Sequence, residues 1–482
     1  MHDQPKPGTI VIKEEAGSRS EQLLHKFGYR QELKRDLGLF SSFALSFSII
    51  SVTTGLFADY GEGLSAAGPA FVWTWLIIGG GQMLVALVFA RLARQIPLSG
   101  YAYQWVRELA GSEIGWWAGW LMLIQFISGM PGVCYALARY LVSFAGFPET
   151  NQNFILATIL ILVSIALINQ FGIKLASRVN DFSVIAEILG TFLVGFLLLG
   201  IALIRHVHPP SFLLTHPGHP GGFAYLGAFA FSSVMSAWTL TGFEGAANCA
   251  EETRAPERQV PIAIILSLAS SVVLGFLVLA GFTLAIPSLS SAETNPVPLL
   301  YIMNSYFPPL LVTAIMLTVF IAIYACALAN LTALTRMVWA MARDRQLPGS
   351  PWLGKISGHQ VPANAIWIVT VLAAIVTSWA KLEVVMTGIA ALAGYLTYAL
   401  VIGAAFFASR RASRSHTAFG ISSGLCLAAL TWVILLFGFL SFPRSARTST
   451  MALAVSLLIG AVLFFLRRRS RVRSEVLDAA EV

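Results

Sequence analysis

Charged residues are scarce in this chain, and the scarcity excludes an ordinary soluble domain. Only 11% of the 482 residues are charged and 57% are hydrophobic, whereas about a quarter of the residues in a typical soluble domain are charged. Cysteine is rare too. The four cysteines lie in or beside apolar runs, and none is spaced like a metal-binding pair, so we expect reduced packing residues. This composition predicts an integral membrane protein.

Long apolar runs supply the membrane-spanning segments. A transmembrane helix needs about 20 apolar residues, and the chain contains twelve suitable runs. We therefore expect an all-α membrane protein with 12 transmembrane helices. The runs cover residues 37–64, 69–95, 114–145, 152–170, 181–204, 223–250, 260–286, 309–340, 363–380, 383–408, 418–441 and 449–466.

The basic residues predict the orientation of the chain. Its first 36 residues carry seven Lys/Arg and lack the apolar core and cleavage site of a signal peptide. With twelve spans both termini lie on one side, and that side holds 26 of the 31 Lys and Arg residues. The positive-inside rule places it in the cytoplasm. The interpretation is a multi-pass protein of the cell (plasma or inner) membrane, and the orientation explains the net charge of +8 without a nucleic-acid partner.

Two spans contain residues that disfavour a continuous helix. SIISVTTGLF places Ser51 and Gly55 deep in the first span, and WTLTGFEG places Gly242, Glu244 and Gly245 near the middle of the sixth. Glycine weakens helices, and a carboxylate at the bilayer centre costs about 2.5–3.5 kcal/mol. We therefore expect a discontinuous helix at each place, serving a binding site.

The spacing of the two interruptions predicts an internal repeat. Five spans separate their starts, so the two broken helices enter the membrane from opposite faces, as in a 5+5 inverted repeat. The predicted divisions are an N-terminal cytosolic tail, a first repeat (helices 1–5), a second repeat (helices 6–10), helices 11–12 and a basic C-terminal cytosolic tail. Their residues are 1–36, 37–204, 223–408, 418–466 and 467–482.

Two broken helices predict a small-molecule site that needs neither cofactor nor metal. Helix N-termini attract an anion and free carbonyl groups at C-termini attract an ammonium group, so an amino acid or a close relative fits best. Trp238 can cover such a ligand; packing between helices is the alternative role for the small residues. The candidate substrate-binding residues are Ser51, Thr53, Thr54, Gly55, Trp238, Thr241, Gly242, Phe243 and Glu244.

Glu244 and Glu187 are the acidic residues well inside the apolar spans, and both are proton-coupling candidates. Burial disfavours the charged form of a carboxyl group, so either could carry a proton. The alternative is a protonated or hydrogen-bonded carboxyl group that serves packing. Other polar groups in spans 3, 8 and 10 are expected mainly to form packing hydrogen bonds: Tyr135, Tyr324, Asn330, Tyr395 and Tyr398.

The remaining features argue against an enzyme or a metal site. His206, His208, His216 and His219 lie in a Pro/Gly-rich segment without an acidic or cysteine companion, so we expect a plain loop. The histidines are all in loops or tails, and no catalytic constellation lies on facing spans.

Several segments resemble the amino acid–polyamine–organocation (APC) permeases, and within them the amino acid/choline (GABA permease-like) branch. FGYRQELKRDLGLFSSFALSFSIISVTTGLF is similar to that branch's entry into span 1, and GFEGAANCAEETRAPERQVP to its span 6 break and cytoplasmic turn. IPLSGYAYQWV and LANLTALTRMVWAMARDRQLP resemble the loop before span 3 and the end of span 8. The resemblance covers about residues 27–440.

The resemblance implies a LeuT-type fold and secondary transport by alternating access. The span 1 break would bind a substrate carboxylate, Trp238 would lie where some relatives have an aromatic lid, and Glu244 would match a proton-sensing acid. Three departures stand out. Tyr101 replaces a usual glycine, Val-Thr-Thr-Gly leaves less room than the usual break, and span 5 lacks the lysine that couples protons in some relatives.

The leading hypothesis is a permease for an amino acid or related amine such as GABA, working by proton symport or by exchange. The alternatives are a polyamine- or choline-type cation transporter and a membrane sensor of the same fold that does not translocate. The expected partners are the small-molecule substrate, protons or a counter-substrate, and the lipid bilayer. The identity of the substrate and the oligomeric state stay open at this point.

Overall fold

The computed structural model describes residues 19–218, 221–295, 297–379, 383–414, 420–441 and 447–480. Across these ranges the protein is helical and forms no sheet; an isolated parallel bridge joins Leu37 to Thr253. The first elements are α1 (Arg19–Lys26), α2 (Leu39–Ile50), α3 (Val52–Ala67), the 3₁₀ turn η1 (Gly68–Val72), α4 (Trp73–Gln95), α5 (Tyr101–Ala110), α6 (Ser112–Phe144), α7 (Asn151–Gln170), α8 (Ile173–Glu187), the π-helical turn η2 (Ile188–Phe192), α9 (Leu193–Ile204) and the 3₁₀ turn η3 (Pro210–Leu214).

The second half is also helical. Its elements are α10 (Phe223–Thr239), α11 (Gly245–Asn248), the 3₁₀ turn η4 (Ala250–Glu252), α12 (Pro256–Leu284), α13 (Leu289–Thr294), α14 (Pro298–Tyr306), α15 (Pro309–Arg343), α16 (Ser350–Leu353), α17 (Ala363–Trp379), α18 (Glu383–Arg414), α19 (Ser423–Ser441) and α20 (Arg447–Ala480).

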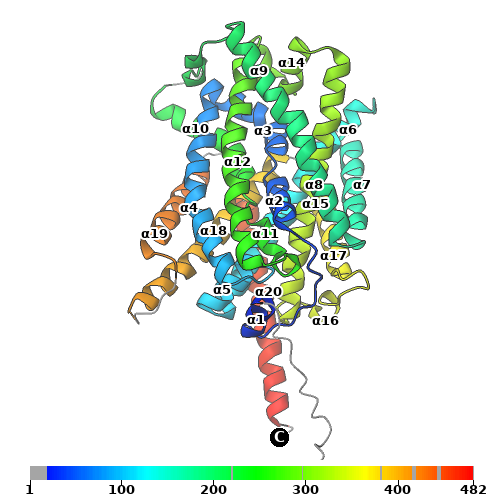
Figure 1. Ribbon diagram of the computed structural model, residues 1–482, viewed down its shortest axis with the longest axis vertical. Coiled ribbons are helices and arrows are strands. Elements are labelled where there is room, and N and C mark those ends of the chain that lie inside the picture. Colours follow the sequence, from blue (N-terminus) through cyan, green and yellow to red (C-terminus); the bar gives the residue numbers. More distant parts are fainter. Residues whose placement is uncertain are drawn as a thin grey trace, which may run out of the picture.

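The long helices form a bundle along the longest axis of the molecule (Figure 1). α1, α5 and α16 lie at the end from which the C-terminal part of α20 protrudes, and we call this the basal end. The opposite, distal end carries α14 and the C-terminal part of α9 (Figure 1).

Nine helical stretches in the described ranges are long and apolar enough to cross a membrane, by length and composition. The predicted number is twelve, and the difference has three causes. η1 joins the first two runs into one helical stretch from Leu39 to Gln95, α10 ends at Thr239 after 17 residues, and the apolar helix Ala363–Ser378 is short. Large apolar side chains such as Leu160, Leu189 and Leu458 are more than half exposed, as expected for surfaces that face lipid rather than water.

Local sequence explains several helix ends and close helix contacts. The Thr150 hydroxyl accepts a hydrogen bond from the Asn153 N–H and so caps α7, while Pro256 begins α12 at a position where its missing N–H costs nothing. α9 and α12 approach very closely, because a Cβ on Gly281 would lie 2.2 Å from the Gly195 carbonyl oxygen. Such contacts between small residues are a common source of helix association in membranes.

The N-terminal segment, by which we mean residues 19–38 before α2, packs across the basal end of the bundle. Leu24, Leu33 and Leu37 are buried there. The Leu37 N–H donates to the Glu252 carbonyl oxygen at 3.0 Å, and the Arg254 N–H donates to the Leu37 carbonyl oxygen at 2.9 Å. The segment is therefore part of the folded protein and covers the basal end of the second interruption.

Candidate functional site

The first interruption lies at Ser51, between α2 and α3. Ser51 adopts the left-handed conformation with φ 37° and ψ 88°, which a residue with a side chain rarely adopts. Its Oγ accepts hydrogen bonds from the Thr54 N–H at 3.2 Å and the Thr54 hydroxyl at 2.7 Å. The second half-helix thus begins at Val52, inside the stretch from Ser51 to Gly55 in which the sequence predicted an interruption.

Glu187 reaches this interruption from the end of α8. Its Oε1 accepts hydrogen bonds from the Thr53 N–H at 2.9 Å and from the Thr53 hydroxyl at 2.8 Å. The same hydroxyl lies 2.7 Å from Thr191 Oγ1 in the π-helical turn η2. A carboxyl group of the protein therefore already occupies part of the positive N-terminal end of α3.

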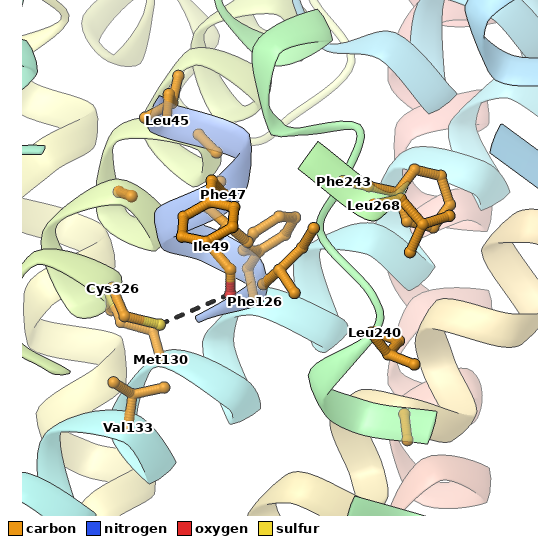
Figure 2. Close-up of a cluster of buried hydrophobic side chains, with 14 of the residues drawn as sticks. Leu45, Phe47, Ile49, Phe126, Met130, Val133, Leu240, Phe243, Leu268 and Cys326 are labelled. Carbon is orange, nitrogen blue, oxygen red and sulfur yellow. Dashed lines mark hydrogen bonds between the residues drawn. The ribbon is translucent and has the colours of Figure 1, made fainter. Parts of the chain in front are cut away.

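The second interruption separates α10 from α11, and close packing against α2 shapes it. Gly242 has φ 90°, and a Cβ there would lie 2.2 Å from Ile49 Cγ2. A Cβ on Gly245 would lie 2.3 Å from Ile49 Cδ1. The Ala246 N–H donates to Ser46 Oγ at 2.9 Å. Both glycines therefore let the broken segment pack directly against Ile49 of α2. Figure 2 shows the non-helical chain that runs from Leu240 to Phe243 in this segment.

The Glu244 side chain is fully buried, and two tyrosines hold it. Its Oε1 accepts a hydrogen bond from the Tyr101 hydroxyl of α5 at 3.1 Å, and its Oε2 lies 2.9 Å from the Tyr398 hydroxyl of α18. The Gly242 N–H donates to the Tyr398 hydroxyl oxygen at 3.4 Å. Tyr101 thus ties the basal helix α5 to the second interruption.

A small cavity lies where the two interruptions meet α6, α15 and α18. Its volume is about 30 Å³, enough for roughly one or two water molecules. Figure 2 shows part of its wall, where the Cys326 thiol donates to the Ile49 carbonyl oxygen at 3.6 Å. No lining residue carries a formal charge: the lining residues are Ile49, Ile50, Thr54, Gln125, Phe126, Gly129, Trp238, Thr239, Thr241, Gly242, Cys326, Asn330 and Ala390.

The predicted site residues divide into two groups. Thr54, Trp238, Thr241 and Gly242 line the cavity. The others lie beside it, in the packing and hydrogen bonds just described or behind the lining, and are not among the lining residues: Ser51, Thr53, Gly55, Phe243, Glu244 and Glu187.

Sequence reasoning missed the contribution of α6. Gln125, Phe126 and Gly129 line the cavity, although the sequence drew attention only to Tyr135 in that span. The available signal was an amide in the middle of the apolar run LMLIQFISGM. Of the other polar groups, Asn330 lines the cavity. Tyr324 lies 2.9 Å from Ser164 Oγ, and the Tyr395 hydroxyl donates to the Ala237 carbonyl oxygen at 2.9 Å.

None of the histidines of the loop that the structure describes lines this cavity. His208 Nε2 lies 2.9 Å from the Ile286 carbonyl oxygen, and its ring stacks on Phe212. His216 stacks on Tyr225, and His219 lies outside the described residues. Among the residues that the structure describes, no group of three or more His, Cys, Asp or Glu could hold a metal ion.

Buried ion pairs close the basal end beneath the cavity. Arg336 and Glu252, both fully buried, form a two-pronged pair with N–O distances of 2.9 and 3.1 Å. Arg343 and Glu251 form a second such pair with the same two distances. The guanidinium of Arg343 also lies 3.9 Å from the ring centre of Tyr29 in the N-terminal segment. These contacts tie η4, α15 and the N-terminal segment together.

Asp344 gathers a further set of donors at the same end. It accepts hydrogen bonds from the Tyr29, Tyr103 and Gln104 side chains and pairs with Arg107 of α5. Burial, followed by the negative charge of Asp344, raises the pKa of Tyr29 to about 12. The phenol therefore stays a hydrogen-bond donor at physiological pH.

Comparison with known proteins gives consistent matches along the chain. The profile of the amino acid permease family matches residues 37–464. The amino-acid permease BAT1 homolog of Oryza sativa subsp. japonica is 29% identical over 453 residues, covering 87% of this chain and 86% of that protein. The branched-chain amino acid permease BcaP of Bacillus subtilis is 26% identical over 460 residues, covering 91% and 94% of the two chains.

Proposed function

Because the chain belongs to the amino acid permease family of the APC superfamily, we propose that it is a secondary active transporter that moves an amino acid or a related amine such as GABA by alternating access. Members of this family are permeases and not enzymes, and the chain is a multi-pass membrane protein. The proposal includes twelve spans in a LeuT-type arrangement, two inverted five-helix repeats, and cytoplasmic termini.

The uncharged cavity between the two interruptions is the observation that carries this proposal. A zwitterion brings its own countercharge, so it needs dipoles rather than charged side chains around it. The start of α3 supplies a positive helix end beside Thr54, and the ends of α2 and α10 supply peptide carbonyl groups. Neither acidic residue lines the cavity, because Glu244 is turned toward Tyr101 and Tyr398 and Glu187 is bound by Thr53. A polyamine or choline would therefore bind there without a facing carboxylate. The lining therefore favours amino acids over the cation alternative.

Within this site the substrate carboxylate is assigned to the Ser51–Thr54 end of α3, and Trp238 covers the bound solute. The cavity volume of about 30 Å³ is smaller than an amino acid, so binding requires the helices around it to separate. In the proposed cycle, solute binding closes access from the distal side. The ion pairs of Glu251 and Glu252 then break, and the basal side opens.

For proton coupling, the hydrogen-bond geometry favours Glu187 over Glu244. Protonation of Glu187 would change its contact with the Thr53 N–H at the substrate-facing helix end. Glu244 instead faces two phenol groups on the basal side. Exchange without a proton is the other possible mode of transport.

The decisive experiment is uptake into proteoliposomes. The panel contains radiolabelled neutral, acidic and basic amino acids, GABA, putrescine and choline, each with and without an inward proton gradient and with and without internal unlabelled solute. We expect saturable uptake of neutral amino acids or GABA. Stimulation by the gradient would indicate symport, and stimulation by internal solute would indicate exchange. Saturable binding without any flux would contradict transport and indicate a sensor.

A further inference from the structure

Gln125 has a buried acceptor without a partner in the candidate cavity. The residue lies on α6 and is 6% exposed, and its Oε1 is buried without a hydrogen-bond partner among the described residues. A buried acceptor that stays unpaired costs about 1–3 kcal/mol. Because most buried polar atoms in native proteins are hydrogen-bonded, an unpaired one needs an explanation.

The packing around Gln125 fixes its amide inside the cavity wall. A Cβ on Gly394 of α18 would lie 3.0–3.3 Å from the three terminal amide atoms of Gln125, so the amide rests against the α18 backbone. One turn further along α6, a Cβ on Gly129 would lie 3.7 Å from Trp238 Nε1. Gln125 and Trp238 therefore belong to the same wall, and both line the cavity.

Asn330, the other amide of the lining, differs from Gln125 because its oxygen is not among the buried side-chain atoms that lack a partner. Asn330 Nδ2 donates to the Cys326 carbonyl oxygen at 2.8 Å. No lining residue is an aspartate or glutamate. Among the lining residues, Gln125 Oε1 is therefore the side-chain oxygen that is buried without any hydrogen-bond partner in the described part of the chain.

We infer that Gln125 is a specificity-determining residue whose side-chain carbonyl oxygen accepts a hydrogen bond from an N–H group of the transported solute. This inference rests on the proposed transport function. A primary or secondary ammonium group satisfies the acceptor. A quaternary ammonium group has no N–H and leaves it unpaired, so Gln125 selects against quaternary amines even when they carry a carboxylate.

The test compares each solute with its N-methylated form. Competition by alanine and GABA, and by their N-trimethyl derivatives, is measured against uptake of the best substrate in proteoliposomes for the wild type and Gln125→Met. Methionine keeps the length of the side chain and removes the carbonyl oxygen. For alanine and GABA we expect Gln125→Met to weaken binding ~10-fold or more, the loss typical of a hydrogen bond to a charged group. For the trimethyl derivatives we expect a change within about twofold, since the lost acceptor has no donor there.

Two further variants make the result specific. Gln346→Met is the matched control, because Gln346 also has a buried unpaired Oε1 but lies beyond the end of α15; we expect wild-type values. Gln125→Glu keeps an acceptor at the same position, and we expect it to retain the preference for N–H-bearing solutes even if Gln125→Met folds poorly.

The outcomes separate this inference from the function on which it rests. Equal weakening of methylated and unmethylated solutes in Gln125→Met, or no weakening of either, would overturn the role of Gln125 while leaving transport intact. Absence of uptake of every solute by the wild type would overturn the transport function itself.

Discussion

Gly55 has no side chain, and Thr239 fills the space that a side chain would need. A Cβ on Gly55 would lie 2.0 Å from Thr239 Oγ1. The Thr239 hydroxyl is fixed because it donates a hydrogen bond to the Met235 carbonyl oxygen of its own helix. We therefore expect Gly55→Ala to push α3 away from α10, to destabilise the protein by about 1–3 kcal/mol, and to abolish uptake. Thermal unfolding in detergent and proteoliposome uptake measure the two effects.

Gly80→Ala on α4 is the matched control for this substitution. No heavy atom lies within 4 Å of the position its Cβ would take, and alanine favours a helix over glycine by about 0.5–1 kcal/mol. Unchanged or slightly raised stability is expected there. A similar loss in both variants would contradict the idea that contact with Thr239 makes Gly55 necessary.

Glu187 and Glu244 have different partners, and this difference gives a second prediction. Glu187→Gln should abolish the dependence of uptake on the proton gradient, because its carboxyl group bonds to the start of α3. Glu244→Gln should alter the rate but keep the gradient dependence, since its partners are Tyr101 and Tyr398. Uptake at several external pH values measures both. The reverse pattern would assign the proton to Glu244.

At the scale of single elements, we expect the attachment of the N-terminal segment to the helix bundle to depend on pH. The pKa of Tyr29, ordinarily near 10, is raised to about 12 by burial and by Asp344. The free energy that this phenol contributes is therefore fully present below pH 10, and it is lost as the pH rises toward 12. We expect hydrogen exchange of residues 19–36 to accelerate in that window.

Tyr29→Phe supplies the control for this alkaline transition. The variant lacks the ionisable hydroxyl, so exchange in the segment should be faster than in the wild type below pH 10 and should show no Tyr29-dependent step between pH 10 and 12. A step of equal size in the variant would assign the transition to other groups.

The helix interruptions could be located from sequence, whereas their contacts could not. Ser51, Gly242 and Glu244 disfavour a membrane helix by their own chemistry, so local reasoning found the positions. The partner of Glu244, Tyr101, lies 143 residues away along the chain. Gln125 likewise enters the cavity through the packing of α6 against α18, which no local pattern encodes. The start of α3 at Val52 depends on Ser51, whose side chain caps the helix.

At the scale of the whole molecule, the two ends should face opposite sides of the membrane. Lys355 is exposed after α16, at the basal end, and Ser211 is exposed in η3, which packs with η1 away from that end. The native cysteines are all buried, so they give little background labelling. We expect a membrane-impermeant thiol reagent to label Ser211→Cys on intact cells and Lys355→Cys only after permeabilisation. The reverse result would invert the predicted topology.

The sequence predicted the class of the whole molecule more securely than its number of spans. Low charge and long apolar runs establish a helical membrane protein, because lipid leaves few alternatives. The number of separate helices depends on whether a turn such as η1 continues one helix into the next, and this is decided by tertiary packing. Hydropathy alone does not report it.

The absence of formal charge around the cavity has an electrical consequence. A zwitterion that binds there crosses the membrane without moving net charge, and the lining adds none. Any current that accompanies uptake must then come from a co-transported ion, and each such charge draws about 2.3 kcal/mol from a membrane potential of 100 mV. Measured current divided by solute flux would therefore count the elementary charges moved per solute molecule, and an exchanger of neutral solutes would be electrically silent.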